Sequence, residues 1–360
     1  MPRSWFHRYF LYDDNYRNYK IPNMDKLVSS CCNVESVPKE YVFPPELRPG
    51  NFTFSVSDST PLIDLGGLDR AAIIQQILRA SQDFGFFQVM NHGVDEELIK
   101  NTSSVLKEFF EMPAEEKATL YSEDPTRSCR LSNSSFSYGG QKITLWRQIL
   151  RQYCHPLDKH IQQWPQNPPT YREVVGNYTE EVTKLGSVIL ELICEGLGLE
   201  SGYFKGEISE NTVFSVNYYP KCPDPILTYG LTAHCDPSLI TILLQDQVGG
   251  LQFFKDGEWI SVQPLPNSFL VNIGYQLQVI SNNMVRSAEH RALTNSREDR
   301  ISGAFFISPT YETIIEPAKH LLTSSNPPLF TSFSYKEFLL NYQANFANPH
   351  LVLERFKLQS

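Results

Sequence analysis

The sequence predicts a mainly β core that is flanked by helices. From about residue 212 onward, apolar residues recur with a period close to two, in short runs separated by turn signals. Before that point, several segments carry apolar residues at helical spacing instead. So many short strands within about 100 residues are typical of a sandwich or a barrel. The 360 residues include 41% apolar and 20% charged side chains, which is enough to bury a sizeable core.

Two strand-and-helix pairs open the N-terminal half. The runs TPLIDL (60–65) and FGFFQVMNHG (84–93) predict short buried strands. Each run is followed by an aspartate suited to cap a helix, and apolar spacing then predicts helices over 70–83 and 96–110. Pro113 is placed to open another short helix.

Helical spacing is longest from Tyr171 to Leu197, where the sequence predicts a helix that stops at the neighbouring glycines. Ahead of this helix, residues 122–142 are polar and rich in turn formers. Such a composition predicts a loop, and its position suggests that it covers another part of the protein.

Seven runs predict the strands of the core: TVFSVNYY, SLITILLQD, GLQFFKDGEWISVQ, SFLVNIG, LQVIS, SAEHRALTN and ISGAFFIS. Asp256–Gly257 lies between two aromatic-rich stretches and predicts a hairpin turn. The chain then returns to a helix over 335–346, where Ser334 and Glu337 form a capping-box pattern.

These patterns divide the chain into four segments. We expect residues 1–23 to be an extension and residues 24–205 to form a mixed helical region. The β core is expected over 206–320, and a C-terminal helix and tail over 321–360.

Composition argues against several classes of protein. A net charge of −9 disfavours nucleic acid or an anionic membrane as partner, because both call for clustered Lys and Arg. No apolar run reaches the roughly 18 residues of a membrane span. The seven cysteines include no Cys-x-x-Cys pair, so neither a disulfide framework nor a structural zinc site is predicted. We therefore expect a cytoplasmic monomer that acts on a small molecule.

The run TAHCDPS places a histidine and an aspartate two positions apart, where a predicted strand begins. Residues i and i+2 of a strand share a face, so His234 and Asp236 point the same way. They can form a hydrogen-bonded pair, part of a catalytic triad or two arms of a metal site. A third ligand is available in His290, within another predicted strand of the core. Two histidines and one carboxylate form the facial triad of non-haem Fe(II) oxygenases, so we predict these three as catalytic iron ligands.

A second pattern follows shortly after His290. Arg300 and Ser302 share a face of the predicted strand RISGAFFIS. A guanidinium binds a carboxylate through two parallel hydrogen bonds, and a serine hydroxyl can add a third. Tyr219 ends another predicted strand and can supply a phenol to the same carboxylate. Each pattern alone is weak, but their ordered combination on predicted strands is specific to a metal site with an anion clamp beside it.

These motifs, in this order, resemble the plant Fe(II)- and 2-oxoglutarate-dependent dioxygenases from about residue 25 to the end. The similarity is carried by FGFFQVMNHG, NYYPKCPDP, AHCD, GGLQ, EHRALTN and RISGAFF. It implies a distorted double-stranded β-helix, or jelly roll, framed by N-terminal helices and a C-terminal helix. It also implies Fe(II) as cofactor, 2-oxoglutarate and O₂ as cosubstrates, and ascorbate as reductant. The 2-oxoglutarate carboxylate is then expected at Arg300, Ser302 and Tyr219, with Asn217 nearby.

Two branches of this family are similar to the chain. YSEDPTRSCRLSNS and TYGLTAHCDPSLITILLQD resemble the downy-mildew-resistance oxygenases, which hydroxylate salicylate and have relatives that act on flavanones. YREVVGNYTEEV and ICEGLGL resemble hyoscyamine hydroxylase, which acts on a tropane alkaloid. The resemblance therefore implies hydroxylation or desaturation of a small plant metabolite: first a salicylate-like phenolic or a flavonoid, second an alkaloid. An oxidase of the same fold that consumes no 2-oxoglutarate and a non-catalytic metal-binding sensor are the alternatives.

The resemblance also suggests residues of the substrate pocket. They are Phe306 and Ser308 at the end of the Arg300 strand, Ser215 on a neighbouring strand, and Phe136 and Tyr138 as a lid in the predicted loop. One position departs from the family, which usually has Gly-Asp where this chain has Gly-Tyr at Tyr275.

Overall fold

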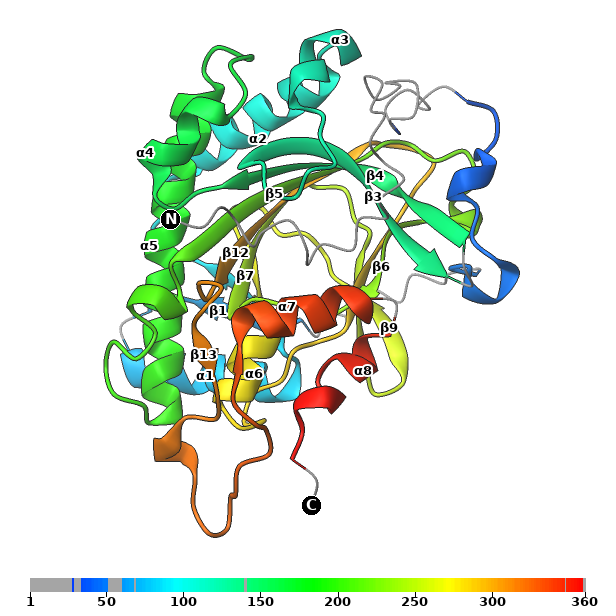
Figure 1. Ribbon diagram of the computed structural model, residues 1–360. Helices are drawn as coiled ribbons and strands as arrows, with labels where there is room; N and C mark the ends of the chain where they lie inside the picture. The colour runs from blue at the N-terminus through cyan, green and yellow to red at the C-terminus, as the bar shows by residue number, and fades with distance from the viewer. Residues whose placement is uncertain are drawn as a thin grey trace, which may run out of the picture.

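Two β-sheets form the core of the protein, and helices lie along the outside (Figure 1). The computed structural model describes residues 28, 34–50, 60–67, 69–138, 141–346 and 348–358. The larger sheet has eight strands in the order β1-β2-β10-β7-β12-β5-β4-β3. In chain order these are β1 Leu62–Asp64, β2 Phe86–Met90, β3 Cys129–Tyr138, β4 Gln141–Tyr153, β5 Asn211–Tyr219, β7 Ile240–Gln245, β10 Phe269–Ile273 and β12 Arg300–Ser308. Among these described strands, the β1–β2 pair is parallel and the other neighbours are antiparallel.

The smaller sheet has four strands in the order β6-β11-β8-β9. They are β6 Tyr229–His234, β8 Leu251–Lys255, β9 Glu258–Ser261 and β11 His290–Leu293. A short pair, β13 Ile314–Ile315 with β14 Phe333–Ser334, lies apart from both sheets in the hydrogen-bond pattern. The predicted turn joins β8 to β9, with φ of 52° at Asp256 and 88° at Gly257. The prediction of a mainly β core with a jelly-roll fold is confirmed.

The described helices are α1 Arg70–Asp83, α2 Glu96–Glu111, α3 Ala114–Lys117, α4 Leu157–His160, α5 Tyr171–Leu197, α6 Tyr275–Ile280, α7 Tyr335–Ala344 and α8 Pro349–Val352. Helices α1, α2, α3, α5 and α7 begin where the sequence predicts them, whereas α4, α6 and α8 were not predicted as helices. Three of them have the predicted side-chain caps, which satisfy backbone N–H groups of the first turn. Asp69 accepts from Ala72, Asp95 accepts from Glu97 and Leu98, and Ser334 accepts from Glu337.

The long helix α5 lies directly against the larger sheet. A Cβ atom at Gly186 would lie 2.0 Å from Cδ1 of Ile307 on β12, so a larger residue there would push the helix away. The helix ends at Gly198, whose φ of 72° is the left-handed conformation that favours glycine at a helix C-terminus. This close contact fixes the position of β12. It therefore also fixes the side chains on the face of β12 that points away from α5.

Two local predictions were wrong. The predicted loop over 122–142 contains all of β3 and the start of β4, which form the edge of the larger sheet. Its polar residues favour turns locally, but the pairing of β3 with β4 overrides that preference. The predicted strand LQVIS instead belongs to helix α6, because a short apolar run that is buried on all sides has no distinguishing period. The boundaries at residues 205 and 320 stay a prediction.

The described cysteines, Cys129, Cys154, Cys194, Cys222 and Cys235, are free and buried. Burial raises the pKa of the Cys235 thiol to about 12, so this thiol stays protonated. Among the helices of the described residues, none is long and apolar enough to span a bilayer.

Candidate active site

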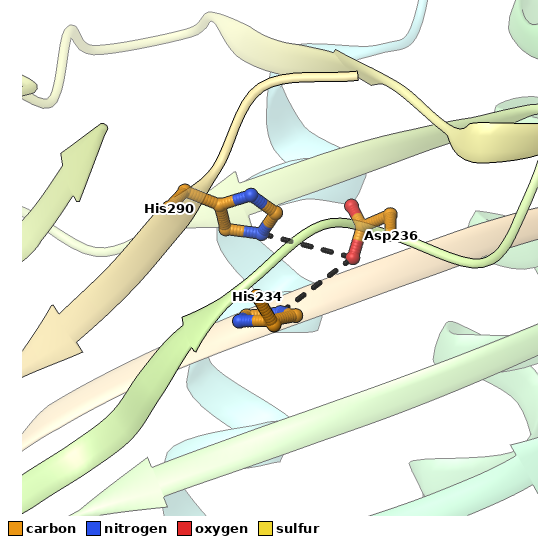
Figure 2. Close-up of side chains that lie close together, drawn as sticks. All are labelled: His234, Asp236 and His290. Atoms are coloured by element: carbon orange, nitrogen blue, oxygen red, sulfur yellow. Dashed lines mark ion pairs between the residues drawn. The ribbon is translucent and has the colours of Figure 1, made fainter. Parts of the chain in front are cut away.

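Three side chains that are distant in the sequence meet where β6 ends and β11 begins (Figure 2). His234, the last residue of β6, is paired in register with His290, the first residue of β11. Asp236 follows β6, and its Oδ1 lies 3.7 Å from Nε2 of His234 and 3.7 Å from Nε2 of His290. The structure thus brings the three predicted residues together.

Hydrogen bonds orient each of these three groups. Nδ1 of His234 lies 2.9 Å from the carbonyl oxygen of Thr232, and Nδ1 of His290 lies 3.0 Å from that of Ala288. A carbonyl oxygen only accepts, so each Nδ1 carries the proton and each Nε2 presents a lone pair towards Asp236. On the opposite side, Nδ2 of Asn272 donates to Oδ2 of Asp236 at 3.1 Å, which leaves Oδ1 facing the histidines.

The charge state of the cluster suits a divalent metal ion. Burial, together with the neighbouring His290, lowers the pKa of His234 well below its usual 6.5, so the imidazole is neutral at neutral pH. Two atoms that each lie about 2.1 Å from one ion are at most about 4.2 Å apart. The separations of 3.7 Å lie within that limit. Two neutral imidazoles and one carboxylate are the donor set of a non-haem Fe(II) centre, so these residues fit iron.

Arg300 lies on the neighbouring sheet, at the start of β12, and is only 2% exposed. It is paired in register with Tyr219 of β5, and its Cζ lies 5.1 Å from the centre of the Tyr219 ring. The guanidinium donates to Oγ of Ser302 at 3.5 Å and to Oε1 of Gln245 at 3.1 Å. These acceptors are neutral, so the predicted cluster of Arg300, Ser302 and Tyr219 is assembled and can bind a carboxylate.

Asn217 connects this cluster to an arginine that the sequence analysis did not single out. It is paired with Ser302 across β5 and β12, and its Oδ1 accepts from Nη1 of Arg147 at 3.0 Å. Arg147 lies on β4, within the stretch LWRQILRQY. Period-two alternation in this stretch was the available signal, because it puts Arg147 on the inner face of a strand that the sequence analysis did not predict.

Comparisons with known proteins agree with this site. A family model described as "2OG-Fe(II) oxygenase superfamily" matches residues 210–309. A second, described as "non-haem dioxygenase in morphine synthesis N-terminal", matches residues 60–168. Protein DOWNY MILDEW RESISTANCE 6 of Arabidopsis thaliana is 44% identical over 336 residues, which cover 92% of this chain and 98% of that protein.

The chain belongs to the 2OG-Fe(II) oxygenase superfamily. It is an Fe(II)- and 2-oxoglutarate-dependent dioxygenase, as the resemblance implied. Flavanone 3-dioxygenase 2 of Oryza sativa subsp. japonica is 44% identical, with 90% of this chain and 95% of that protein covered. Hyoscyamine 6-dioxygenase of Hyoscyamus niger is 43% identical, with 85% of this chain and 91% of that protein covered.

The dioxygenase is also similar to a solved structure that contains bound ligands. A crystal structure of JOX2 in complex with 2OG, Fe and JA has a TM-score of 0.79 and 39% identity, over 87% of this chain and 92% of that chain. This similarity supports the jelly-roll fold of the dioxygenase.

Three of the predicted substrate residues lie on the face of the larger sheet that also carries Arg300 and Ser302. Ser215 on β5 is buried and faces the same side as Asn217, two residues along the strand. Phe306 and Ser308 lie on β12, on the same face as Arg300 and Ser302.

The two predicted lid residues lie on β3 rather than in a loop. The ring of Phe136 packs against Phe43, with ring centres 5.6 Å apart, in a cluster that includes Tyr229. The side chain of Tyr138 lies outside the described residues.

The C-terminal helix α7 and the residue Phe346 that follows it lie beside the predicted metal ligands. The hydroxyl of Tyr342 donates to the backbone carbonyl of Cys235 at 3.0 Å, between two of the predicted ligands. Beyond the helix, the ring of Phe346 lies 5.9 Å from the imidazole of His234. Helix α7 therefore forms one wall of the dioxygenase site.

Tyr275, where the resemblance led us to expect an aspartate, contacts this C-terminal segment. Its hydroxyl donates to the carbonyl of Pro349 at 2.8 Å, and its ring packs against those of Phe338 and Tyr342. Burial raises the pKa of Tyr275, so it remains a neutral donor. The departure from the family thus replaces a carboxylate by an aromatic anchor for α7 and α8.

Proposed function

We propose that the dioxygenase hydroxylates or desaturates a small plant specialised metabolite, a phenolic such as salicylate or a flavonoid, while 2-oxoglutarate is converted into succinate and CO₂. One observation carries this proposal: a complete facial ligand set and an arginine clamp occur together in one buried interior. Flavanone 3-dioxygenase 2 among the relatives supports a flavonoid-like substrate.

Each residue of the interior then has a role. His234, Asp236 and His290 hold iron(II), and Asn272 keeps the carboxylate turned towards it. When bound, iron(II) would activate O₂, and 2-oxoglutarate would supply two of the four electrons that O₂ accepts, with the substrate supplying the other two. Arg300, Ser302, Tyr219 and Asn217 bind and orient the distal carboxylate of 2-oxoglutarate.

The substrate pocket is proposed to include Ser215, Phe306 and Ser308, with Phe136 and Tyr138 at its entrance. Phe306 offers an aromatic face, and the two serines offer hydroxyls that can orient a polar group of the substrate.

Further properties are inferred from the same chain. We infer a cytoplasmic monomer that uses ascorbate to keep iron reduced and that has no nucleic acid or membrane as partner. The net charge of −9 supports the last point.

A second candidate is oxidation of a tropane or other alkaloid, which is favoured by the 43% identity to hyoscyamine 6-dioxygenase. An alkaloid is cationic at neutral pH, so it places a positive charge close to the arginines of the interior. Salicylate and flavanones carry no positive charge and avoid this repulsion.

A turnover assay tests the proposal. Purified enzyme is incubated with Fe(II), ascorbate, 2-oxoglutarate and one of salicylate, a flavanone or hyoscyamine. We expect succinate release that depends on the phenolic compound, with a product heavier by one oxygen atom or lighter by two hydrogens. Oxidation of hyoscyamine alone favours the second candidate. Oxidation without added 2-oxoglutarate, or succinate release by Asp236→Ala, contradicts the proposed roles.

A further inference from the structure

The inner face of β4 carries two arginines that the mechanism does not use. Ile149 is paired with Asn217, and Arg151 with Ser215, so these residues share the face that contains the 2-oxoglutarate cluster. Arg147 lies two residues before Ile149 and therefore points the same way. The strand thus presents Arg147, Ile149 and Arg151 to the interior.

Arg147 connects β4 to the strands on either side of it, β3 and β5. Its Nε donates to Oγ of Ser134 at 2.7 Å, and its Nη1 donates to Oδ1 of Asn217 at 3.0 Å. Burial lowers its pKa, while Tyr219 and Tyr342 favour its charged form.

Arg151 lies further along the strand and is half-buried. Its Cζ lies 6.0 Å from the centre of the Tyr153 ring. Burial raises the pKa of Tyr335 on α7 to about 12, and the positive charge of Arg151 opposes this rise.

Neither arginine has an acidic partner in the part of the chain that the structure describes. Among the described residues, no carboxylate forms a hydrogen bond or an ion pair with Arg147 or Arg151, and the acceptors of Arg147 are neutral oxygens. Arg300 differs, because Asp246 lies close enough for the two charges to interact.

A charge count of the loaded site points to a missing anion. The two charges of iron(II) are balanced by the two of 2-oxoglutarate. Asp236 and Asp246 offset Arg300 and one further arginine, so positive charge remains. An unpaired buried charge is costly, and a carboxylate on the substrate would remove that cost.

We propose that Arg147 and Arg151 bind the carboxylate of the substrate, and that the substrate is a small aromatic acid. The inference rests on the proposed function and narrows it: a salicylate-like acid is favoured over a neutral flavanone and a cationic alkaloid. The rings of Tyr335 and Tyr342 on α7, and of Phe346 beside His234, provide the aromatic surroundings.

Binding without turnover tests the inference. Enzyme loaded with Fe(II) and 2-oxoglutarate is kept anaerobic, and calorimetry measures two matched pairs of probes: salicylate with salicylamide, and cinnamate with cinnamamide. Each pair differs only in whether a carboxylate or a neutral amide is present. We expect at least one acid to bind about 10-fold or more tightly than its amide, as a charge-assisted hydrogen bond provides. Equal affinity within both pairs, or no binding of either acid, overturns the inference.

Substitutions of the two β4 arginines test whether they cause the tighter binding of the acid. Arg147→Gln and Arg151→Gln should each weaken binding of the acid about 10- to 100-fold and leave the amide and 2-oxoglutarate within about 2-fold. Arg79→Gln, on the exposed face of α1, is the matched control and should change nothing. If Arg147→Gln does not fold, the half-buried Arg151 decides alone. Loss of 2-oxoglutarate binding instead would assign the arginines to the cosubstrate and overturn the inference.

The outcomes separate this inference from the proposed function. Binding of an acid that depends on Arg147 and Arg151, without succinate release in air, supports the anion site and contradicts the proposed turnover of that acid. Turnover of a neutral flavanone without an acid preference supports the function and overturns the anion site.

Discussion

The centre and the edge of the larger sheet each present an arginine to the same interior. At the centre, Arg300 begins β12 and interacts with Tyr219 and Ser302. Towards the edge, Arg147 on β4 interacts with Asn217 and Ser134. Both side chains are buried, but Arg300 has an acid nearby and Arg147 has none among the described residues. The difference indicates that the two arginines bind different anions, the cosubstrate at the centre and the substrate near the edge.

The largest effect is expected from removing Asp236, the carboxylate of the predicted metal site. Asp236→Ala leaves two imidazoles to hold iron, so succinate formation should fall on the order of 1,000-fold or more. Succinate measured by mass spectrometry checks this, and iron content measured alongside shows whether the metal is lost. Near-normal succinate formation would mean that neither arginine serves an iron-centred reaction.

The next effect separates the two arginines directly. Arg300→Gln should raise the KM for 2-oxoglutarate on the order of 100-fold, because a charged, hydrogen-bonded partner of a carboxylate is removed. Arg147→Gln should leave this KM within about 3-fold, because its effect falls on the substrate. Steady-state kinetics with varied 2-oxoglutarate measure both values. Equal increases in the two variants would contradict a division of roles.

A smaller effect is expected from a residue that contacts a metal ligand but not the metal. Asn272→Ala removes the donor that orients Asp236, so iron affinity should fall about 10- to 100-fold. Anaerobic titration with Fe(II) measures the affinity, with Asn101→Ala on the exposed face of α2 as control. An unchanged affinity would show that β6 alone fixes the carboxylate.

The stability of the metal-free protein should depend on pH through His234. Its pKa is lowered in the folded state, so below about 6.5 the unfolded chain binds a proton that the folded chain does not. The free energy of unfolding should therefore be highest above pH 6.5 and fall as the pH decreases, by at most about 1.4 kcal/mol per pH unit for this residue.

Urea unfolding of the metal-free protein between about pH 5 and 7 measures this slope. His234→Gln should reduce the slope, whereas Arg147→Gln should preserve it, because an arginine does not titrate in this range. A slope that is the same with and without the imidazole would mean that His234 is solvated and not buried as described.

The smallest effect concerns the wall that α7 contributes. Tyr342→Phe removes the hydrogen bond to the carbonyl of Cys235 and should lower the free energy of unfolding by about 1 kcal/mol. Urea unfolding with the same protein preparation checks this, and iron affinity should be nearly unchanged. A large loss of iron binding would show that α7, and not β6, positions the ligands.

The sequence predicted the centre of the site better than its edge for physical reasons. His234 and Asp236 follow the i, i+2 rule of strands, and Arg300 and Ser302 repeat it, so their faces could be inferred locally. Their meeting with His290 depends on strand pairing, which the ordered motifs supported. Helices such as α1 and α5 were predicted at their observed bounds, because caps and apolar spacing are local signals.

The edge depended on contacts that are distant in the sequence. The run SNSSFS in β3 carries polar residues that favour turns, and it becomes a strand through pairing with β4. No strand was predicted for the part of β4 beyond residue 142, so nothing placed Arg147 on an inward face. In the same way, the role of Tyr275 required the position of Pro349, which no local pattern gives.

A crystal structure of the protein grown anaerobically with Fe(II), 2-oxoglutarate and salicylate tests the central claim most directly. The account predicts iron within about 2.0–2.3 Å of Nε2 of His234, Nε2 of His290 and Oδ1 of Asp236. It further predicts the far carboxylate of 2-oxoglutarate on Arg300 and the salicylate carboxylate on Arg147 and Arg151. Iron bound elsewhere, or 2-oxoglutarate held by the arginines of β4, would contradict it.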